Sequence, residues 1–357
     1  MNTRQLAALV QADIPVQLWD DPGTGKTKFT AALARALAQA TGIPYQMHTE
    51  ILSQCDPTDF GIPREQDGKM VRLPLDWIVK AVAHPTILFF DEFSLAPRTV
   101  LAATLTLIQD RRIADRQLHK DTRIILASNP AEFTGMELLP QQSNRMAHID
   151  FSALVPLADW ARGMLAGFPD LEIPKLPEAW QASIPKHRAL VASFITRFPT
   201  EGFRRPKELG KAWPSRRTWD MAATACAAVE SIREDDSLPT ASLVGEGPAL
   251  QYIQWRNQQD IPDFGVLLAD AANHPLPDED TKLFVILSGC AAHTVANPSQ
   301  KLWDACWQVC GRAIDMGKAD ISTIAARVLV ENDKKFKGCR LPKVAEKLIP
   351  ILRASGV

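Results

Sequence analysis

The 357-residue chain has no long apolar run and no excess of either charge. Nowhere do eighteen apolar residues follow one another, so we expect no membrane-spanning helix, no membrane partner and a cytoplasmic location. Lys and Arg number 40 against 41 Asp and Glu, which lowers the expectation of nucleic-acid binding without excluding a local basic pore. Six scattered cysteines in so long a chain indicate reduced thiols rather than disulfide staples.

The remaining composition is that of a folded protein with more than one domain. Hydrophobic residues make up 46% and charged residues 23%, which is far from a disordered composition. The length exceeds what one hydrophobic core usually organises. Strand patterns end near residue 151, and polar residues interrupt the helical pattern at 234–239. We therefore predict an α/β domain over 1–151, a helical domain over 152–236 and a helical region over 237–357.

The N-terminal pattern predicts a parallel sheet. Short apolar runs alternate with amphipathic stretches from about residue 14 to 150, as strands and crossover helices do. Ala and Leu recur at helical spacing over residues 26–41, which predicts a helix that packs one face on the sheet. The predicted strands cover residues 16–19, 44–49, 87–90, 123–127 and 147–151.

A glycine-rich segment follows the first predicted strand and opens the first predicted helix. This is the context of a phosphate-binding loop, whose backbone N–H groups close on phosphates at the positive end of a helix dipole. Lys26 is expected to reach the β- and γ-phosphates of ATP, and Thr27 to bind Mg²⁺. A plain glycine-rich turn is the alternative, but it does not require Lys-Thr directly after its glycine. The residues expected to contact nucleotide are Asp21, Pro22, Gly23, Thr24, Gly25, Lys26, Thr27 and Phe29.

The loop departs from the usual pattern at its first position, where Asp20 replaces glycine. A carboxylate beside a triphosphate is repelled, so weakened or lost nucleotide binding is one outcome. Asp nevertheless tolerates unusual backbone angles better than most residues. We therefore expect the loop to be retained, with the Asp20 side chain directed away from the nucleotide.

Two carboxylates end the strand predicted over 87–90. Neighbouring side chains alternate across a strand, so the two can have different roles. Asp91 is expected to support Mg²⁺, and Glu92 to orient and polarise the attacking water. Two acidic residues after a strand are common by themselves, and it is the preceding phosphate-binding loop that makes this pair informative.

Further polar residues are candidates for the same chemistry. Asn129 follows the strand predicted over 123–127 and could hold the water or the γ-phosphate, with a simple Asn-Pro turn as the alternative. Arg145 lies in a predicted surface loop, from which it could reach a neighbouring subunit's γ-phosphate as an arginine finger. A solvated surface arginine is the alternative there. Ser215 is predicted to cap a helix that opens with two arginines, one of which could contact nucleotide.

Five motifs in this order resemble the MoxR-like branch of AAA+ ATPases, close to the dynein-related group. They cover residues 18–27, 56–63, 87–92, 127–130 and 213–219. The resemblance implies an α/β fold with a P-loop AAA+ core, in which helices flank a parallel sheet, followed by an all-helical lid and a helical C-terminal region. It also implies that Arg217 is the lid's sensor arginine and that hairpins over 56–74 and 111–122 face the pore or substrate side.

The same resemblance implies a homo-oligomeric ring, commonly a hexamer, beside a partner protein with a von Willebrand factor A domain. The predicted function is therefore ATP hydrolysis at subunit interfaces, with Mg²⁺, coupled to chaperone-like remodelling of a partner protein. Two alternatives stay open. One is a nucleotide-dependent recruitment switch that hydrolyses ATP slowly or not at all, and the other is a motor directed at nucleic acid in defence or restriction.

Overall fold

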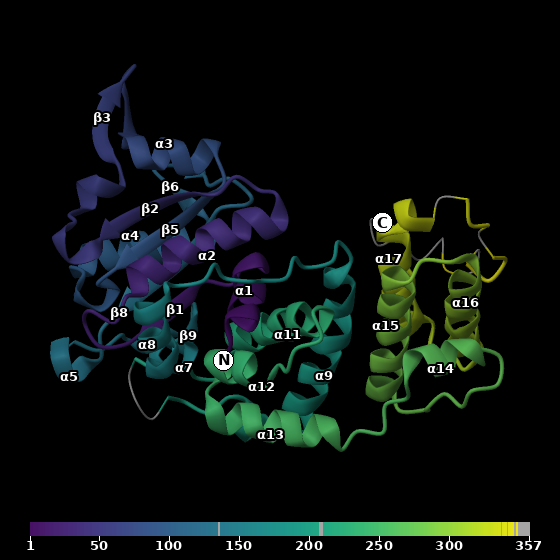
Figure 1. Ribbon diagram of the computed structural model, residues 1–357. Coiled ribbons are helices and arrows are strands. Elements are labelled where there is room, and N and C mark those ends of the chain that lie inside the picture. Colours follow the sequence, from purple (N-terminus) through teal and green to yellow (C-terminus); the bar gives the residue numbers. More distant parts are fainter. Residues whose placement is uncertain (135, 207–209, 337, 341, 346–347, 349–357) are drawn as a thin grey trace. The chain divides into compact units, whose positions relative to one another are not determined.

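The computed structural model describes residues 1–134, 136–206, 210–336, 338–340, 342–345 and 348 (Figure 1). The chain forms two compact units, residues 1–176 with 203–249 and residues 177–202 with 250–357. The segment 203–249 therefore packs with the N-terminal domain. The predicted division at 151/152 and 236/237 rests on sequence pattern rather than on packing and stays a prediction. Residues 349–357 of its last part lie outside the described residues.

The first unit is built on a five-stranded parallel sheet in the order β2-β5-β8-β1-β9. All five predicted strands are present, each shifted by at most two residues at either end. The predicted fold, a parallel sheet flanked by helices and followed by helical segments, is thereby confirmed. The strands are β1 (Val16–Trp19), β2 (Gln46–Ile51), β5 (Thr86–Asp91), β8 (Arg123–Ser128) and β9 (Ala147–Asp150).

Burial follows the order of the strands. Every residue of β8 and all but the last residue of β5 are buried, as expected for central strands covered on both faces. β2 has only exposed and half-buried residues and lies at one edge of the sheet. This arrangement places the carboxyl ends of β1, β5 and β8 side by side at one end of the sheet.

Helices cover both faces of the sheet. On one face, Leu88 and Phe90 of β5 join a buried cluster with residues of α3 (Asp76–Ala83) and α4 (Arg98–Asp110). α2 (Lys26–Thr41) contacts β2 and β5 and has the bounds that its sequence predicts. Residues of opposite parity along a strand face opposite sides, so each central strand contributes to both layers.

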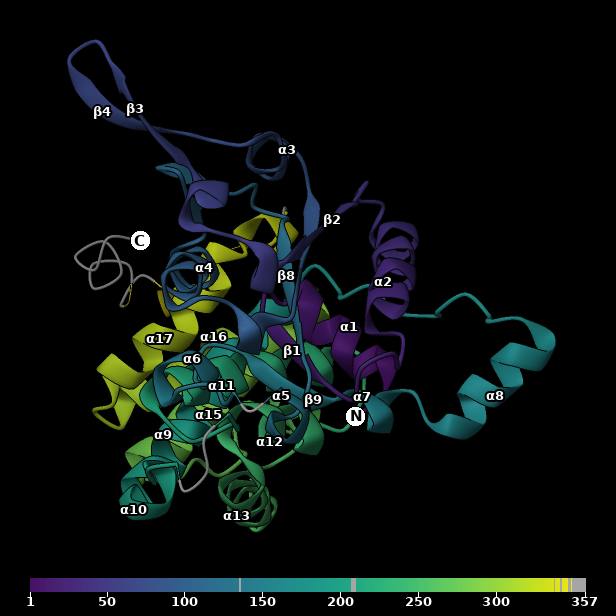
Figure 2. The ribbon, with the colours of Figure 1, turned by 90° about the vertical axis from the view of Figure 1, so that its left-hand side faces the viewer.

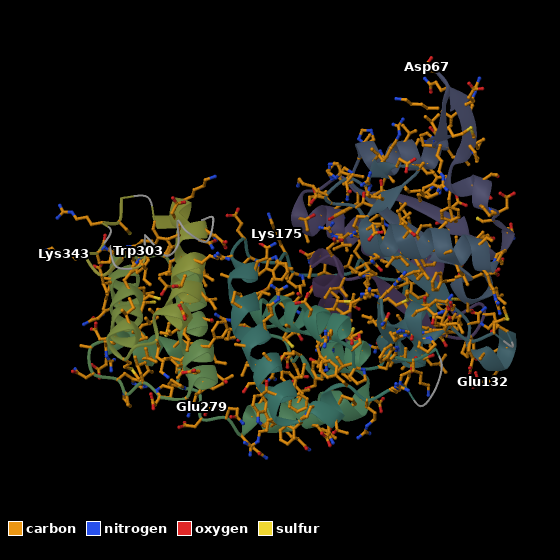
Figure 3. All side chains as sticks on the ribbon, turned by 180° about the vertical axis from the view of Figure 1, so that it is seen from behind. Asp67, Glu132, Lys175, Glu279, Trp303 and Lys343 are labelled. Carbon is orange, nitrogen blue, oxygen red and sulfur yellow. The ribbon has the colours of Figure 1, made fainter. Side chains whose placement is uncertain are left out.

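Two hairpins extend from this domain, as predicted. The first, β3 (Ile62–Gln66) with β4 (Lys69–Leu73), is largely exposed and projects from the domain in Figure 2. Asp67 lies at its tip (Figure 3). The second is short and consists of β6 (Arg112–Ile113) and β7 (Arg116–Gln117).

The base of the first hairpin meets the turn of the second. Gly61 has a φ of 140°, and a Cβ atom on it would lie 3.1 Å from the Cβ of Ala114 in the turn of the second hairpin. A larger residue at position 61 would therefore push the hairpins apart, so glycine allows the contact. The hairpins form one continuous surface of the domain.

The remaining helices of the first unit include a three-helix group formed by α1 (Thr3–Gln11), α11 (Arg216–Ser231) and α12 (Ser237–Val244). Ser215 caps α11, as predicted: its hydroxyl accepts a hydrogen bond from the Thr218 N–H at 3.2 Å. The other short elements are η1 (Leu52–Gln54), η2 (Pro57–Phe60), η3 (Phe93–Leu95), α5 (Ala131–Thr134), α6 (Pro140–Ser143), α7 (Phe151–Leu154) and α8 (Leu157–Ala166).

The described part of the second unit is helical. Its core contains Trp303, Cys306, Trp307 and Cys310, all buried on one helix, which supports core packing as the role of these cysteines and tryptophans. No helix within the described ranges has the length and apolarity needed to cross a membrane. The elements are η4 (Trp180–Ser183), α9 (Ile184–Arg197), α10 (Pro199–Gly202), α14 (Phe264–Ala269), α15 (Asp280–Ala296), α16 (Gln300–Asp315), α17 (Ala319–Glu331) and η5 (Asp333–Phe336), while α13 (Glu246–Asn257) begins in the first unit.

Candidate nucleotide site

The glycine-rich loop has the backbone of an anion cradle. Gly23 and Gly25 have φ angles of 82° and 99°, a left-handed conformation that side chains disfavour. No atom lies within 4 Å of a Cβ built on either glycine, so the space above the loop is open. α2 begins at Lys26 directly after the loop, so its free N–H groups and its dipole point into the same space. The loop therefore fits a phosphate chain.

Lys26 lies at the centre of the site with 7% of its surface exposed. Its Nζ donates to the backbone oxygens of Asp20 and Asp21 at 2.8 and 2.9 Å and to Oδ1 of Asn129 at 3.1 Å. Burial lowers the pKa of Lys26, and the charges of Asp20, Asp91 and Asp21 oppose that shift. The structure thus brings together Lys26 and Asn129, both predicted from the sequence.

Thr27 and Asp91 form the hard-oxygen pair expected of a magnesium site. The Thr27 hydroxyl donates to Oδ2 of Asp91 at 3.4 Å, although the two residues lie on α2 and at the end of β5. The other carboxylate oxygen of Asp91 accepts the Glu92 N–H at 2.9 Å. A hydroxyl and a carboxylate beside a phosphate cradle are ligands that Mg²⁺ uses, so these two residues fit the ion.

Glu92 has a left-handed backbone, with φ 55° and ψ 36°. This conformation is uncommon for a residue with a side chain and often marks functional sites. The hydroxyl of Ser53, in η1 directly after β2, donates a hydrogen bond to Oε2 of Glu92. Sequence reasoning did not find Ser53, because a lone serine after an edge strand carries no recognisable pattern.

The Asp20 carboxylate is engaged beside the loop rather than in it. Its Oδ1 accepts the Asp21 N–H at 2.8 Å and the Ser152 hydroxyl at 2.8 Å. The bond from Ser152 joins the start of the loop to α7, the short helix after β9. The ring of Phe29 makes an edge contact with the ring of Phe151 in α7, with the ring centroids 5.3 Å apart. The predicted contact of Phe29 with nucleotide stays a prediction.

Arg145 and Arg217 lie together, away from the phosphate loop. They line a pocket of about 350 Å³, together with residues 12–15 and Asp220. Arg217 donates to Oδ1 of Asn144 at 3.2 Å and to Oε1 of Gln109 at 3.3 Å. The two arginines, 72 positions apart in the chain, thus form one cationic group.

This pocket lies at the opposite end of the strands from the phosphate loop. Residues 12–15 precede β1 and Arg145 precedes β9, whereas the loop follows the last residue of β1. β1 has four residues, a length of about 13 Å at roughly 3.3 Å per residue. Arg145 and Arg217 therefore do not join the Lys26 cluster of their own chain.

Residues 16–146 match the family model of the AAA domain, dynein-related subfamily. These residues form a dynein-related AAA+ domain. The match spans the phosphate loop, the Asp91–Glu92 pair, Asn129 and Arg145, and it confirms the resemblance to the dynein-related group of AAA+ ATPases drawn from the motifs. AAA+ domains as a class bind and hydrolyse nucleoside triphosphates.

Two solved structures are similar to parts of the chain at low sequence identity. A protein from Cytophaga hutchinsonii, provisionally described as an ATPase, is 17% identical over 65% of this chain and 75% of its own, with a TM-score of 0.42. A full-length MCM homologue from Methanopyrus kandleri is 16% identical over 70% of this chain and 53% of its own, with a TM-score of 0.39. No curated protein sequence matches the chain.

Charges of both signs surround the arginine pocket of this AAA+ domain, because Asp13 and Asp220 line it together with the two arginines. Burial lowers the pKa of Arg145, the neighbouring Arg217 lowers it further, and Asp110 opposes both. The Nε atom of Arg145 is buried and has no hydrogen-bond partner among the described residues. Two like charges side by side, one with an unused donor, favour a negatively charged group.

Proposed function

We propose that the protein is an ATPase that works as a ring, commonly a hexamer in proteins of this type, and hydrolyses ATP between subunits. One observation carries this proposal: the Lys26 cluster and the Arg145–Arg217 pair lie at opposite ends of the same strands. Within the described residues of one subunit, the phosphate cradle and the arginine pair do not meet. In a head-to-tail ring, the arginines of one subunit complete the site of the next.

The residues at the carboxyl end of the sheet would divide the chemistry among them. Lys26 would bind the β- and γ-phosphates, and Glu92 would accept a proton from the attacking water. Asn129, already bonded to Lys26, would orient the water or the γ-phosphate. Thr27 and Asp91 would hold Mg²⁺, which when bound neutralises negative charge on the phosphates.

Arg145 and Arg217 would act on the nucleotide of the neighbouring subunit. The sequence predicts that Arg217 contacts nucleotide from the lid, but it does not indicate which subunit binds that nucleotide. Its place beside Arg145, away from its own phosphate loop, supports a role in the neighbouring site. Two guanidinium groups at one γ-phosphate stabilise the charge that develops in the transition state.

Subunit mixing tests the proposal. Glu92→Gln should bind ATP and not hydrolyse it, and Arg145→Ala should do the same. A mixture of the two should regain ATPase activity, because a subunit with Glu92 then meets a neighbour with Arg145. Arg216→Ala, a neighbouring exposed arginine, serves as the control and should retain full activity.

The result that would contradict the proposal is equally specific. If both variants bind ATP and elute as rings in size-exclusion chromatography but their mixture stays inactive, the proposed interfacial site is wrong. A Glu92→Gln variant that hydrolyses ATP at the rate of the unaltered protein removes the assigned base.

The task of the ring, in this proposal, is to remodel a partner protein. The support is the joined surface of the two hairpins, on which Met70 is 72% and Ile62 is 49% exposed. Exposed apolar side chains on a projecting hairpin suit transient contacts with a polypeptide. The resemblance to MoxR-like proteins adds a partner with a von Willebrand factor A domain.

A photo-crosslinking amino acid at position 70 tests this role. Crosslinks to a polypeptide that depend on ATP, and that a matched probe at exposed Arg35 of α2 does not give, would support it. Crosslinks only to nucleic acid would contradict it and would favour the alternative motor.

A further inference from the structure

Trp19 and His148 join the strand that carries the phosphate loop to the strand that follows Arg145. Trp19 is the last residue of β1, directly before Asp20, and His148 is the second residue of β9. The indole Nε1 of Trp19 donates to Nδ1 of His148 at 2.9 Å, and the two rings stack with centroids 6.0 Å apart. The contact lies within one domain, between neighbouring parallel strands.

The bond from Trp19 fixes which nitrogen of His148 carries the proton. An indole N–H can only donate, so Nδ1 of His148 must be the acceptor and Nε2 must hold the hydrogen of the neutral ring. Nε2 lies 2.7 Å from the backbone oxygen of Ser143 and therefore donates to it. Burial lowers the pKa of His148 to about 4, so the ring is neutral at pH 7.

The Ser143 oxygen is the point at which the arginine loop begins. Ser143 ends α6, so its carbonyl has no partner further along that helix. The bond from His148 closes the short loop that contains Arg145, since it joins the residue two before the arginine to the residue three after it. Arg217 holds the next residue, Asn144, from the other side.

The charges around the Arg145 guanidinium act in opposite directions, because Arg217 repels it and Asp110 attracts it. Its Nε has no hydrogen-bond partner among the described residues. The backbone of the loop from Ser143 to His148 sets where the side chain starts. A change in that loop therefore moves the arginine.

We propose that His148 is a positioning residue for the arginine finger: oriented by Trp19, it clamps the loop that presents Arg145 to the neighbouring subunit. This inference rests on the proposed interfacial site. The clamp also joins Arg145 to the strand that ends in the phosphate loop of the same subunit. In each subunit, the strand that carries the phosphate loop therefore helps to position the arginine that acts on the neighbouring subunit.

Three variants separate the clamp from simple packing. His148→Phe fills the space but cannot donate to Ser143, and we expect kcat for ATP to fall roughly tenfold or more, with the KM for ATP within about twofold. His148→Gln keeps a donor of similar reach and should retain more activity than the phenylalanine variant. Trp19→Phe keeps an aromatic ring on β1 but no longer fixes the imidazole, so its kcat should also fall.

Mixing experiments locate the defect. His148→Phe mixed with Glu92→Gln should regain activity, because the second supplies a well-placed Arg145 to the intact phosphate loop of the first. His148→Phe mixed with Arg145→Ala should show no activity beyond that of the two variants measured separately, since neither subunit supplies a well-placed arginine. The Arg145→Ala and Glu92→Gln mixture is the reference, and its failure would refute the interfacial site rather than the clamp.

Two outcomes overturn the clamp. Activity in the His148→Phe and Arg145→Ala mixture above that of the two variants measured separately would place the defect of His148→Phe in its own nucleotide site. An unchanged kcat in both His148→Phe and Trp19→Phe would remove the positioning role altogether. Binding of a fluorescent ATP analogue verifies folding, and if His148→Phe does not fold, the same mixtures are made with Trp19→Phe, whose results decide in the same way.

Discussion

The hydroxyl of Ser53 donates a hydrogen bond to the carboxylate of Glu92, the residue that we propose activates water. Ser53 belongs to η1, and the chain continues from there through η2 into the projecting β3–β4 hairpin. The segment from η1 to the β3–β4 hairpin contacts Glu92 at one end and forms an exposed surface at the other. Binding of a client protein to the hairpin can therefore affect the proposed site of hydrolysis. While η1 stays in place, the hydrogen bond from Ser53 restrains the side chain of Glu92.

Ser53→Ala should raise the basal ATPase rate by roughly two- to fivefold, because loss of one hydrogen bond of about 1 kcal/mol frees the Glu92 side chain to turn toward water. Steady-state phosphate release measures the rate. Ser53→Thr keeps the hydroxyl and should remain near the original rate. A lower rate in the alanine variant would mean that Ser53 aligns Glu92 for catalysis rather than restraining it.

Asp20 should be tolerated because its carboxylate bonds to the Asp21 N–H and to Ser152, beside the loop. We expect Asp20→Asn, which can accept both bonds, and Asp20→Gly to bind ATP within about threefold of the original affinity, since a solvated charge directed away from the phosphates adds little repulsion. Titration with a fluorescent ATP analogue measures this. Binding tightened tenfold or more in both variants would show that the carboxylate does oppose the nucleotide.

The strands and the nucleotide residues were predictable from the sequence because local patterns determine them. β1 is an apolar run that ends at a glycine-rich loop, and α2 follows with Ala and Leu at helical spacing. The carboxyl ends of parallel strands lie at one end of a sheet, which brings Asp91 and Asn129 to Lys26 without further information. Chain topology alone therefore placed this half of the site.

The contacts between distant side chains were not predictable. Ser53 meets Glu92 across 39 positions, and Trp19 meets His148 across 129. Neither pair has a spacing motif, since each depends on how two strands pair and where a short turn ends. The position of Arg217 beside Arg145 likewise depends on how the segment 203–249 packs on the first domain, which no local pattern specifies.

The stability of the protein should fall as the pH is lowered from 6.5 toward 4, in part through His148. Burial lowers the pKa of this residue from 6.5 to about 4 in the folded protein. The unfolded chain therefore binds the proton first, and this contribution, fully present above pH 6.5, decreases by on the order of 1 kcal/mol at pH 5. Thermal unfolding at pH 7.5 and 5.0 measures the loss. His148→Gln cannot titrate and should lose less on acidification, whereas parallel losses in both proteins would contradict the assignment.

Arg217 should act on the nucleotide of the neighbouring subunit, because it bonds to Asn144 and lines the pocket of Arg145, at the far end of β1 from its own loop. Arg217→Ala should lower kcat by roughly 10²-fold or more, the size expected for removal of one donor to transition-state charge. Mixed with Glu92→Gln it should regain activity, and mixed with Arg145→Ala it should not, because both variants then lack part of the same arginine pair. Arg216→Ala, changed one residue away on the exposed start of α11, should behave as the original protein. If Arg217→Ala and Arg145→Ala instead complement each other, the two arginines serve different sites, and Arg217 belongs to the nucleotide of its own subunit.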